Sequence, residues 1–320
     1  MRALITGGAG FIGSHLLDAV LEQGDSAIVL DNLATGSHIN IRHHIADPRL
    51  EFVNGSILNA DLVDDLVSRS DVVFHLAAAV GVKLIVERPL ESLITNVRGS
   101  EVLLEKAHKY GKKFLLTSTS EVYGKSPDLP LREDGDRLLG PPQVGRWSYS
   151  TSKAVDEILA HAYWKSKGLP VVIVRLFNTV GPRQSGEYGM VVPRFVQSAL
   201  EGKDLTVHGD GSQSRCFGYV GDIVPALLAL MDSREAEGEV VNLGSTEEVT
   251  IADLAKLIIE ITGSKSKIRF IPYEEAFGAE FEDMPRRIPS IAKAEKLIGF
   301  EPRTNLREII DLMVLDAERR

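Results

Sequence analysis

A glycine-rich turn near the start of the chain constrains the fold more than any other feature. Residues 6–13 read TGGAGFIG, with Gly8, Gly10 and Gly13 spaced as G-x-G-x-x-G. The turn follows a short apolar run at 2–6, and the apolar residues of 11–23 then recur at helical spacing. Between a strand and a helix, glycines leave room for a pyrophosphate beside the free N–H groups of the helix. The sequence therefore predicts a dinucleotide site.

An acidic residue ends the second expected strand. The mainly apolar run 26–30 leads to Asp31, 18 residues after Gly13, and Asn32 follows it. A carboxylate at this place accepts hydrogen bonds from the adenosine ribose and repels a 2′-phosphate, which favours NAD over NADP. We therefore expect NAD to be bound by residues of both segments, namely Gly7, Gly10, Phe11, Ile12, Gly13, Asp31 and Asn32.

Strands and helices alternate through the first half of the chain. Apolar strands are expected at 26–30, 50–54, 71–76, 113–118 and 170–176. Helical periodicity separates them at 61–69, 90–110 and 148–168. Apolar strands that alternate with helices indicate a parallel sheet covered on both faces. The predicted fold class is thus α/β, a Rossmann doubly wound parallel sheet formed by residues 1–177.

The part of the chain after residue 178 follows a different pattern. Its short strands are expected near 205–208, 239–243 and 267–271. Its helices are expected at 191–201, 222–232, 250–262, 290–298 and 305–316. We interpret residues 178–320 as a smaller C-terminal α/β lobe that packs on the sheet, exchanges chain segments with it and holds a second ligand.

Composition and charge exclude several classes of protein. The 320 residues carry 36 Lys and Arg against 45 Asp and Glu, a net charge of −9, whereas a general nucleic-acid binder needs a basic surface. No apolar run is long enough for a membrane span, and the start of the chain lacks the pattern of a signal peptide. The one cysteine, Cys216, allows no internal disulfide, and His43 and His44 are interpreted as a solvated pair rather than metal ligands. We expect a cytoplasmic protein that binds no metal, nucleic acid or membrane.

Several motifs together resemble one family. TGGAGFIG, the pair Asp31 and Asn32, HLAA at 75–78, Asn96 and the spacing Tyr149-x-x-x-Lys153 resemble the extended short-chain dehydrogenase/reductase family, more narrowly its nucleotide-sugar epimerases, dehydratases and decarboxylases. The resemblance runs from residue 2 to about 310. It implies a nucleotide-sugar substrate, such as a UDP-sugar, and a homodimer paired through helices 90–110 and 148–168. It also implies cofactor contacts from Leu76, Ala77, Ala78, Asn96, Tyr149 and Lys153. Ser56 replaces an Asp that meets the adenine in many relatives, so no contact is predicted there.

Tyr149 and Lys153 are predicted to carry out acid–base chemistry. They are four residues apart at the start of helix 148–168 and therefore share one of its faces. A free phenol is a poor base at neutral pH because its pKa is about 10. A neighbouring ammonium and the positive charge of oxidised nicotinamide both favour the phenolate. Tyr149 can then take the proton of a sugar hydroxyl while a hydride leaves the same carbon.

Thr119, Ser120 and Glu121 follow the fifth expected strand, at the carboxyl edge of the sheet where such folds bind ligands. We predict that all three are catalytic, with a hydroxyl holding the reacting oxygen. In the family that the chain resembles, plain 4-epimerases usually carry no acid at the position of Glu121. Dehydratases and sugar-acid decarboxylases do, because they handle a proton on the neighbouring carbon.

Four residues of the second lobe are assigned to the substrate by resemblance. Asn178 in LFNTVGPR and Arg215 in the loop 209–215 match family residues that contact the substrate phosphates. The segment 189–200, with Val192, matches one that contacts the nucleotide. Arg suits a diphosphate since its planar fork of donors binds two oxygens. Arg287 begins R-x-P-S-I, which resembles the segment of UDP-glucuronate decarboxylases whose Arg faces the sugar carboxylate.

These residues predict NAD-dependent modification of a nucleotide sugar through a transient 4-keto sugar. Decarboxylation of UDP-glucuronate, as in a UDP-xylose synthase, is ranked first, since the 4-ketone lets CO₂ leave to an enolate rather than a bare carbanion. A 4-epimerase of UDP-glucose or UDP-glucuronate is the alternative, and a 4,6-dehydratase is third. A redox-sensing or RNA-associated protein that binds the dinucleotide without turnover is disfavoured, because Tyr149 and Lys153 are both present and the chain is acidic.

Overall fold

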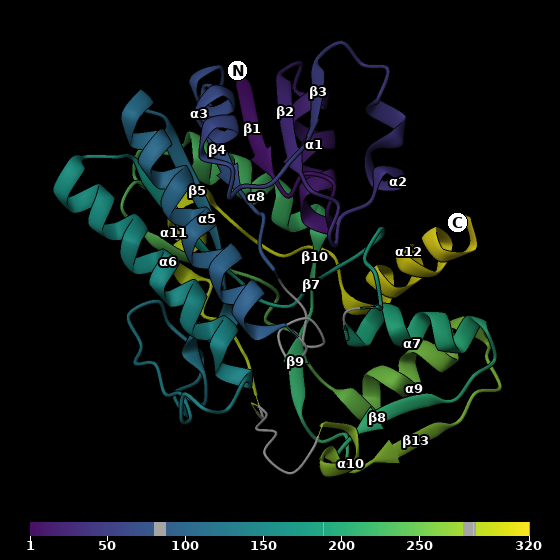
Figure 1. Cartoon of the computed structure of the whole chain (residues 1–320). Coiled ribbons are helices and arrows are strands. Elements are labelled where there is room, and N and C mark those ends of the chain that lie inside the picture. The colour runs from purple at the N-terminus through teal and green to yellow at the C-terminus, as the bar shows by residue number, and fades with distance from the viewer. Residues whose placement is uncertain (80–87, 188, 278–283, 285, 320) are drawn as a thin grey trace.

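A seven-stranded sheet forms the centre of the molecule, and all of its strands run parallel to their neighbours (Figure 1). The computed structural model describes residues 1–79, 88–187, 189–277, 284 and 286–319. From one edge to the other the strands are β3 (Leu50–Asn54), β2 (Ser26–Asp31), β1 (Arg2–Thr6), β4 (Val72–His75), β5 (Lys113–Thr119), β6 (Val171–Leu176) and β11 (Val240–Leu243). The chain reverses its direction of winding between β1 and β4, where doubly wound folds bind ligands. The predicted Rossmann fold class is confirmed.

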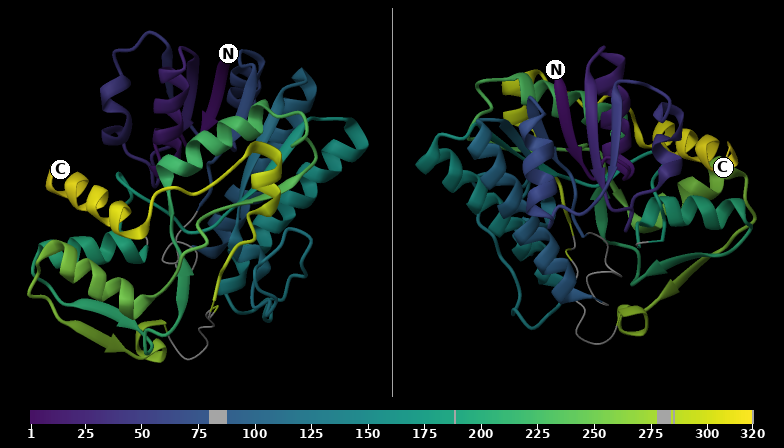
Figure 2. Two further views of the ribbon diagram at one scale, coloured as in Figure 1. Left: turned by 180° about the vertical axis from the view of Figure 1, so that it is seen from behind. Right: turned by 45° about the horizontal axis from the view of Figure 1, so that its top comes forward.

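Helices cover both faces of the sheet (Figures 1 and 2). One face packs against α1 (Phe11–Glu22), α8 (Val220–Asp232) and α11 (Ala292–Ile298). The other face packs against α3 (Ala60–Ser68), α5 (Pro89–Tyr110) and α6 (Arg146–Lys167). In β1 the neighbours Leu4 and Ile5 are fully buried in these two different cores. Because both faces are buried, the strands are apolar without alternation, which is the pattern that predicted them.

The smaller lobe is built around three helices that share one apolar core. They are α7 (Val191–Leu200), α9 (Ile251–Thr262) and α12 (Leu306–Arg319). Short strand pairs surround them, namely β8 (Leu205–His208) with β13 (Ile268–Ile271), β9 (Ser214–Cys216) with β12 (Glu248–Thr250), and β7 (Thr179–Val180) with β10 (Gly218–Tyr219). The remaining short elements are α2 (His38–Ile41), η1 (Arg42–His44), η2 (Ser120–Tyr123) and α10 (Tyr273–Phe277).

Segments of the second half of the chain return to the large sheet. The sequence predicts a strand near 239–243 within the smaller lobe, but β11 instead pairs with β6 as the seventh strand of the sheet. The physical reason is that β6 is apolar and buried, so its outer edge needs a hydrogen-bonding partner. Helices α8 and α11 also pack on this sheet. The domain boundary between residues 177 and 178 stays a prediction. Strand β11 and helices α8 and α11 come after it in the chain but pack with the first domain.

The two longest helices of the described chain, α5 and α6, lie side by side. Each ends at a glycine in the left-handed conformation, Gly111 with φ 62° and Gly168 with φ 67°.

Within the described residues, no helix combines the length and the apolar character that crossing a membrane requires.

Candidate active site

A cavity of about 1620 Å³ lies between the carboxyl ends of the sheet strands and the smaller lobe. Its wall comes from the glycine turn, the segments that follow β4 and β5, the start of α7, and residues of the smaller lobe. Ordinary small-molecule pockets measure about 300–1,000 Å³. The cavity therefore has room for a dinucleotide and a second ligand together.

The glycine turn forms a cradle that side chains cannot occupy. A Cβ atom at Gly13 would lie 2.2 Å from the carbonyl oxygen of Gly7, and one at Gly7 would lie 2.8 Å from the amide nitrogen of Ala77. Gly7 also has a φ of +72°, which other residues rarely adopt. Gly10 is the N-cap of α1 and offers no side chain to the N–H groups of the first turn. These amides remain available to an anion, so the turn fits the pyrophosphate of NAD.

Asp31 is buried at the end of β2 and lines the cavity. Its carboxylate accepts hydrogen bonds from the amides of Leu33 at 2.8 Å and Ala9 at 3.0 Å. Burial raises the pKa of Asp31, and these two amides oppose that rise. The side chain therefore fastens the glycine turn to the loop after β2 and keeps oxygen lone pairs for a ribose. The neighbouring Asn32 is exposed and also lines the cavity.

The segment after β4 brings three more predicted residues, Leu76, Ala77 and Ala78, to the cavity wall. Asn96 is placed differently: it is buried on α5 behind that wall. Its side-chain oxygen accepts a hydrogen bond from the amide of Ala79 at 2.7 Å, and its nitrogen donates to Ser152 Oγ at 3.2 Å. Asn96 thus holds the segment after β4 in place, and a direct cofactor contact from it stays a prediction.

The predicted catalytic residues Thr119, Ser120, Glu121 and Tyr149 come together on the cavity wall. Thr119 caps η2 by accepting a hydrogen bond from the amide of Glu121 at 3.2 Å. Tyr149 lies in the first turn of α6 and is half-buried. Burial raises the pKa of Tyr149, and the negative charges of Glu121 and Asp156 raise it further. In the protein without NAD, this pKa therefore moves against the direction that base catalysis needs.

Lys153 is buried behind the cavity wall, one turn along α6 from Tyr149. Its ammonium donates a hydrogen bond to Asp156 Oδ2 at 3.0 Å. Asp156 is a functional candidate that was not predicted from the sequence, although its spacing of three residues from Lys153 places both side chains on one helix face. That spacing is the signal that identifies it.

The predicted substrate residues line the opposite part of the cavity, which is formed by the smaller lobe and the chain before α11. Asn178, Val192, Arg215 and Arg287 all belong to this wall. Arg287 Nη1 lies 3.6 Å from Glu121 Oε1 and 3.5 Å from Ser120 Oγ, so it bridges the lobe side to the catalytic motif. Arg194 of α7 also lines the cavity and was not predicted. Its Nε is buried and has no hydrogen-bond partner among the described residues.

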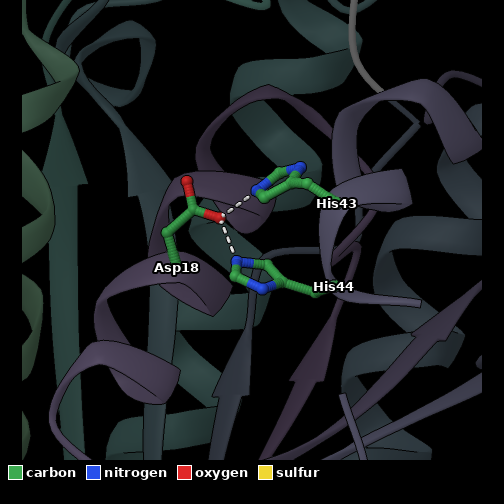
Figure 3. Close-up of side chains that lie close together, drawn as sticks. All are labelled: Asp18, His43 and His44. Atoms are coloured by element: carbon green, nitrogen blue, oxygen red, sulfur yellow. Dashed lines mark hydrogen bonds and ion pairs between the residues drawn. The ribbon is translucent and has the colours of Figure 1, made fainter. Parts of the chain in front are cut away.

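His43 is exposed and His44 is half-buried, so the predicted pair reaches solvent, but both rings also contact the carboxylate of Asp18 (Figure 3). The Nε2 atoms of both rings lie 2.9 Å from Asp18 Oδ1 on α1. Arg183 Nη2 contacts the other carboxylate oxygen, Oδ2, at 2.6 Å. Despite partial burial, these three partners lower the pKa of Asp18. The cluster connects η1, α1 and the chain after β7.

Known proteins resemble this chain over most of its length. A model of the NAD dependent epimerase/dehydratase family matches residues 3–244. A UDP-N-acetyl-alpha-D-glucosaminuronate decarboxylase of Bacillus cytotoxicus is 43% identical over 302 residues, which are 94% of this chain and 92% of that protein. UDP-glucuronic acid decarboxylase 1 of Danio rerio is 40% identical over 308 residues, which are 96% of this chain and 70% of that protein. The crystal structure of UDP-glucuronic acid 4-epimerase from Bacillus cereus, in complex with UDP-glucuronic acid and NAD, aligns with a TM-score of 0.90 at 29% identity, over 100% of this chain and 99% of that one.

Proposed function

This chain belongs to the NAD dependent epimerase/dehydratase family, and on that premise we propose that it decarboxylates a UDP-linked uronic acid, with UDP-glucuronate as the first candidate. The two curated relatives described above, at 43% and 40% identity, are named as decarboxylases of such acids. NAD, when bound, accepts a hydride from C4 of the sugar and returns it at the end of the cycle.

The position of Arg287 beside Glu121 and Ser120 is the observation on which the proposal rests. The Arg287 side chain is 11% exposed and that of Glu121 is 17% exposed, at the edge of the cavity. A neutral sugar needs no cation at this place, whereas a guanidinium matches the two oxygens of a carboxylate. Glu121 is then in position to serve a proton transfer that a plain epimerase does not need.

Each catalytic residue has a defined task in this scheme. Tyr149 takes the proton of the sugar O4 as the 4-ketone forms and gives it back when the ketone is reduced, and the positive charge of Lys153 favours its phenolate. Thr119 and Ser120 hold O4 through their hydroxyl groups. Arg287 binds the C6 carboxylate. When the C5–C6 bond breaks, its electron pair enters the enolate of the ketone and CO₂ leaves. Glu121 then relays a proton from water to C5, which restores the ketone.

The binding residues divide between the two ligands. We assign the glycine turn, Asp31, Asn32 and residues 76–78 to NAD, and residues 1–177 to its domain. We assign Asn178, Val192 and Arg215 to the UDP moiety, and residues 178–320 to the nucleotide-sugar lobe. The start of α7 supports this division, because its first turn has no side-chain cap and lies at the cavity wall.

A UDP-sugar 4-epimerase is the second candidate. The structural match to UDP-glucuronic acid 4-epimerase favours it. A cation that faces a sugar carboxylate would serve both reactions, which differ in whether CO₂ leaves while C4 is a ketone.

The first experiment is to incubate the purified protein with NAD⁺ and UDP-glucuronate and to follow the sugar by proton NMR and mass spectrometry. The proposal expects a product lighter by CO₂ with a pentose spectrum. An isobaric product with an inverted C4 signal would make the protein an epimerase. UDP-N-acetylglucosaminuronate is tested in parallel, because a relative is named for that substrate. If neither acid reacts, UDP-glucose tests for a neutral-sugar enzyme.

Two adjacent arginines provide a matched pair for the carboxylate contact. Arg287→Ala should lower kcat/KM for UDP-glucuronate by about 100-fold, because a hydrogen-bonded charge pair is lost. Arg286→Ala should leave it unchanged, since the exposed Arg286 instead pairs with both oxygens of Glu248. Equal effects of the two substitutions would refute the proposed contact.

We also propose that the protein is a cytoplasmic homodimer that pairs through α5 and α6. Large apolar side chains are exposed on these helices, with Leu90 70% exposed, Ile94 44% and Ile158 64%. Light scattering should give twice the 35.0 kDa chain mass. Ile158→Glu should give the mass of one chain. A wild-type protein of single-chain mass would contradict the dimer.

A further inference from the structure

The catalytic helix contains a buried ion pair that the proposed reaction scheme does not yet use. Lys153 Nζ and Asp156 Oδ2 are 3.0 Å apart, and their side chains are 2% and 0% exposed. On α9, Asp253 and Lys256 form a pair with the same three-residue spacing, but these side chains are 58% and 68% exposed. Exposed ion pairs contribute little to the stability of a protein. A buried ammonium that loses its partner, by contrast, strongly destabilises the folded state. Asp156 therefore constrains Lys153 far more than Asp253 constrains Lys256.

The surroundings of Asp156 leave Lys153 as the cation that balances its charge. Ser100 of α5 faces the carboxylate, and Ser100 Oγ lies 3.0 Å from His75 Nε2 of β4. Burial lowers the pKa of His75 well below its usual value, so this ring is neutral. The next acid on α6, Glu157, is already paired with Arg175 at 2.8 Å.

One oxygen of the Asp156 carboxylate has no hydrogen-bond partner. It is Oδ1, and the statement holds for the residues that the structure describes. Burial raises the pKa of Asp156, and the Lys153 ammonium on Oδ2, together with the Ser100 hydroxyl, opposes that rise. The two charges therefore depend on each other, and each fixes the position of the other.

We propose that Asp156 is a positioning residue of this active site: it holds the Lys153 ammonium, one helical turn from Tyr149, and sets the pH above which Tyr149 acts as the base. The proposal deepens the function proposed above, since it rests on the roles assigned to Tyr149 and Lys153. Asp156 contacts Lys153 and acts through it, from behind the cavity wall.

Asp156 has two opposing effects on Tyr149. By holding Lys153 it keeps a cation where the phenolate needs one, and its own negative charge works with that of Glu121 to raise the pKa of Tyr149. Asp156→Asn removes the negative charge and weakens the contact that fixes the Lys153 ammonium. The maximal kcat should therefore fall about tenfold, because Lys153 is less firmly fixed. The two losses shift the pKa of Tyr149 in opposite directions, but the charge is lost completely whereas the Asn carbonyl oxygen still accepts from Lys153. The acidic limb of the kcat–pH profile should therefore move to lower pH. A residue that only stabilised the helix would lower kcat without moving this limb.

The test compares kcat across pH for the wild type, Asp156→Asn, Asp156→Glu and the matched control Asp253→Asn. We expect Asp156→Glu to recover the wild-type limb and to keep kcat within about threefold, because it retains the charge. Asp253→Asn should match the wild type. An unmoved limb in Asp156→Asn, or an Asp156→Glu enzyme no better than Asp156→Asn, would overturn the proposal.

Folding and substrate identity are controlled separately. If Asp156→Asn does not give a cooperative melting transition, Asp156→Glu is compared with Lys153→Met. If the acidic limb of the kcat–pH profile of Asp156→Glu lies where it does in the wild type, the proposal is supported. If the kcat of Asp156→Glu is as low as that of Lys153→Met, the proposal is refuted. If the wild type converts no UDP-uronate, the proposed function fails. The same variants are then compared across pH by the rate at which NADH forms with UDP-glucose. A failure of the proposed function is thereby distinguished from a failure of the role proposed for Asp156.

Discussion

The two ends of the cavity are built in different ways. The end that we assign to the cofactor comes from short stretches at the ends of adjacent strands, and the glycine turn with Asp31 lies within the first 31 residues. The end that we assign to the substrate gathers Asn178, Arg215 and Arg287 from segments that are far apart along the chain. A strand–turn–helix motif specifies its own geometry, whereas the substrate end exists only once the smaller lobe packs against the sheet.

The largest expected effect lies between the two ends. Tyr149→Phe should lower kcat by about a thousandfold, because general acid–base groups contribute about 10²–10⁴. UDP should bind as in the wild type, and NAD⁺ should lose no more than the single contact of the Tyr149 hydroxyl; calorimetry measures both affinities. Tyr163→Phe, on the same helix, is the control and should keep full activity. Intact turnover by Tyr149→Phe would show that another group is the base.

Gly13→Ala should damage the cofactor end alone. Its Cβ would lie 2.2 Å from the Gly7 carbonyl oxygen, so the turn must shift. Overpacking of this kind costs about 1–3 kcal/mol, which corresponds to about 5–150-fold weaker NAD⁺ binding if the shift is confined to the turn. Gly145→Ala is the control, because nothing lies within 4 Å of its added Cβ. If UDP binding weakened equally, the two ends would not be independent.

Arg215→Ala is the converse test at the substrate end. UDP should bind about tenfold more weakly, because one charged hydrogen-bond donor to phosphate is lost. NAD⁺ affinity should not change. Arg307→Ala, which removes an exposed pair with Glu260, should affect neither ligand. Loss of NAD⁺ binding in Arg215→Ala would contradict the assignment of this residue to the nucleotide sugar.

The smallest effect on the binding of either ligand is expected at Asp18, which lies outside both ends, so its substitution is measured by stability instead. Its partners lower its pKa, so its interactions stabilise the folded state above the usual pKa of an Asp, and this contribution is lost as pH falls through the lowered value. Asp18→Asn should reduce the free energy of unfolding by about 1–3 kcal/mol at neutral pH. Urea unfolding of the two proteins should converge at strongly acidic pH. A pH-independent difference would show that shape rather than charge matters at Asp18.

Much of the large domain was predictable because its signals are local. The apolar strands, the glycine turn, Asp31 and the spacing of Tyr149 and Lys153 lie on single elements or at their ends. The strand near 239–243 was also visible in the sequence, but its place in the sheet was not, because hydrophobicity marks a strand and not its partner. The same limit applied to His43 and His44, whose partner Asp18 lies 25 residues or more away along the chain.

The sequence by itself determined the doubly wound fold, the dinucleotide turn and the identity of the chemical groups in the active site, because each depends on the conformation of a short segment. Tertiary structure alone decided that Arg287 meets Glu121, that Asn96 lies behind the cavity wall, and that the pair of Lys153 and Asp156 is buried. Contact and burial depend on how distant segments pack. Packing also sets the strength of a charge pair, because it excludes water and so lowers the dielectric constant around the two charges.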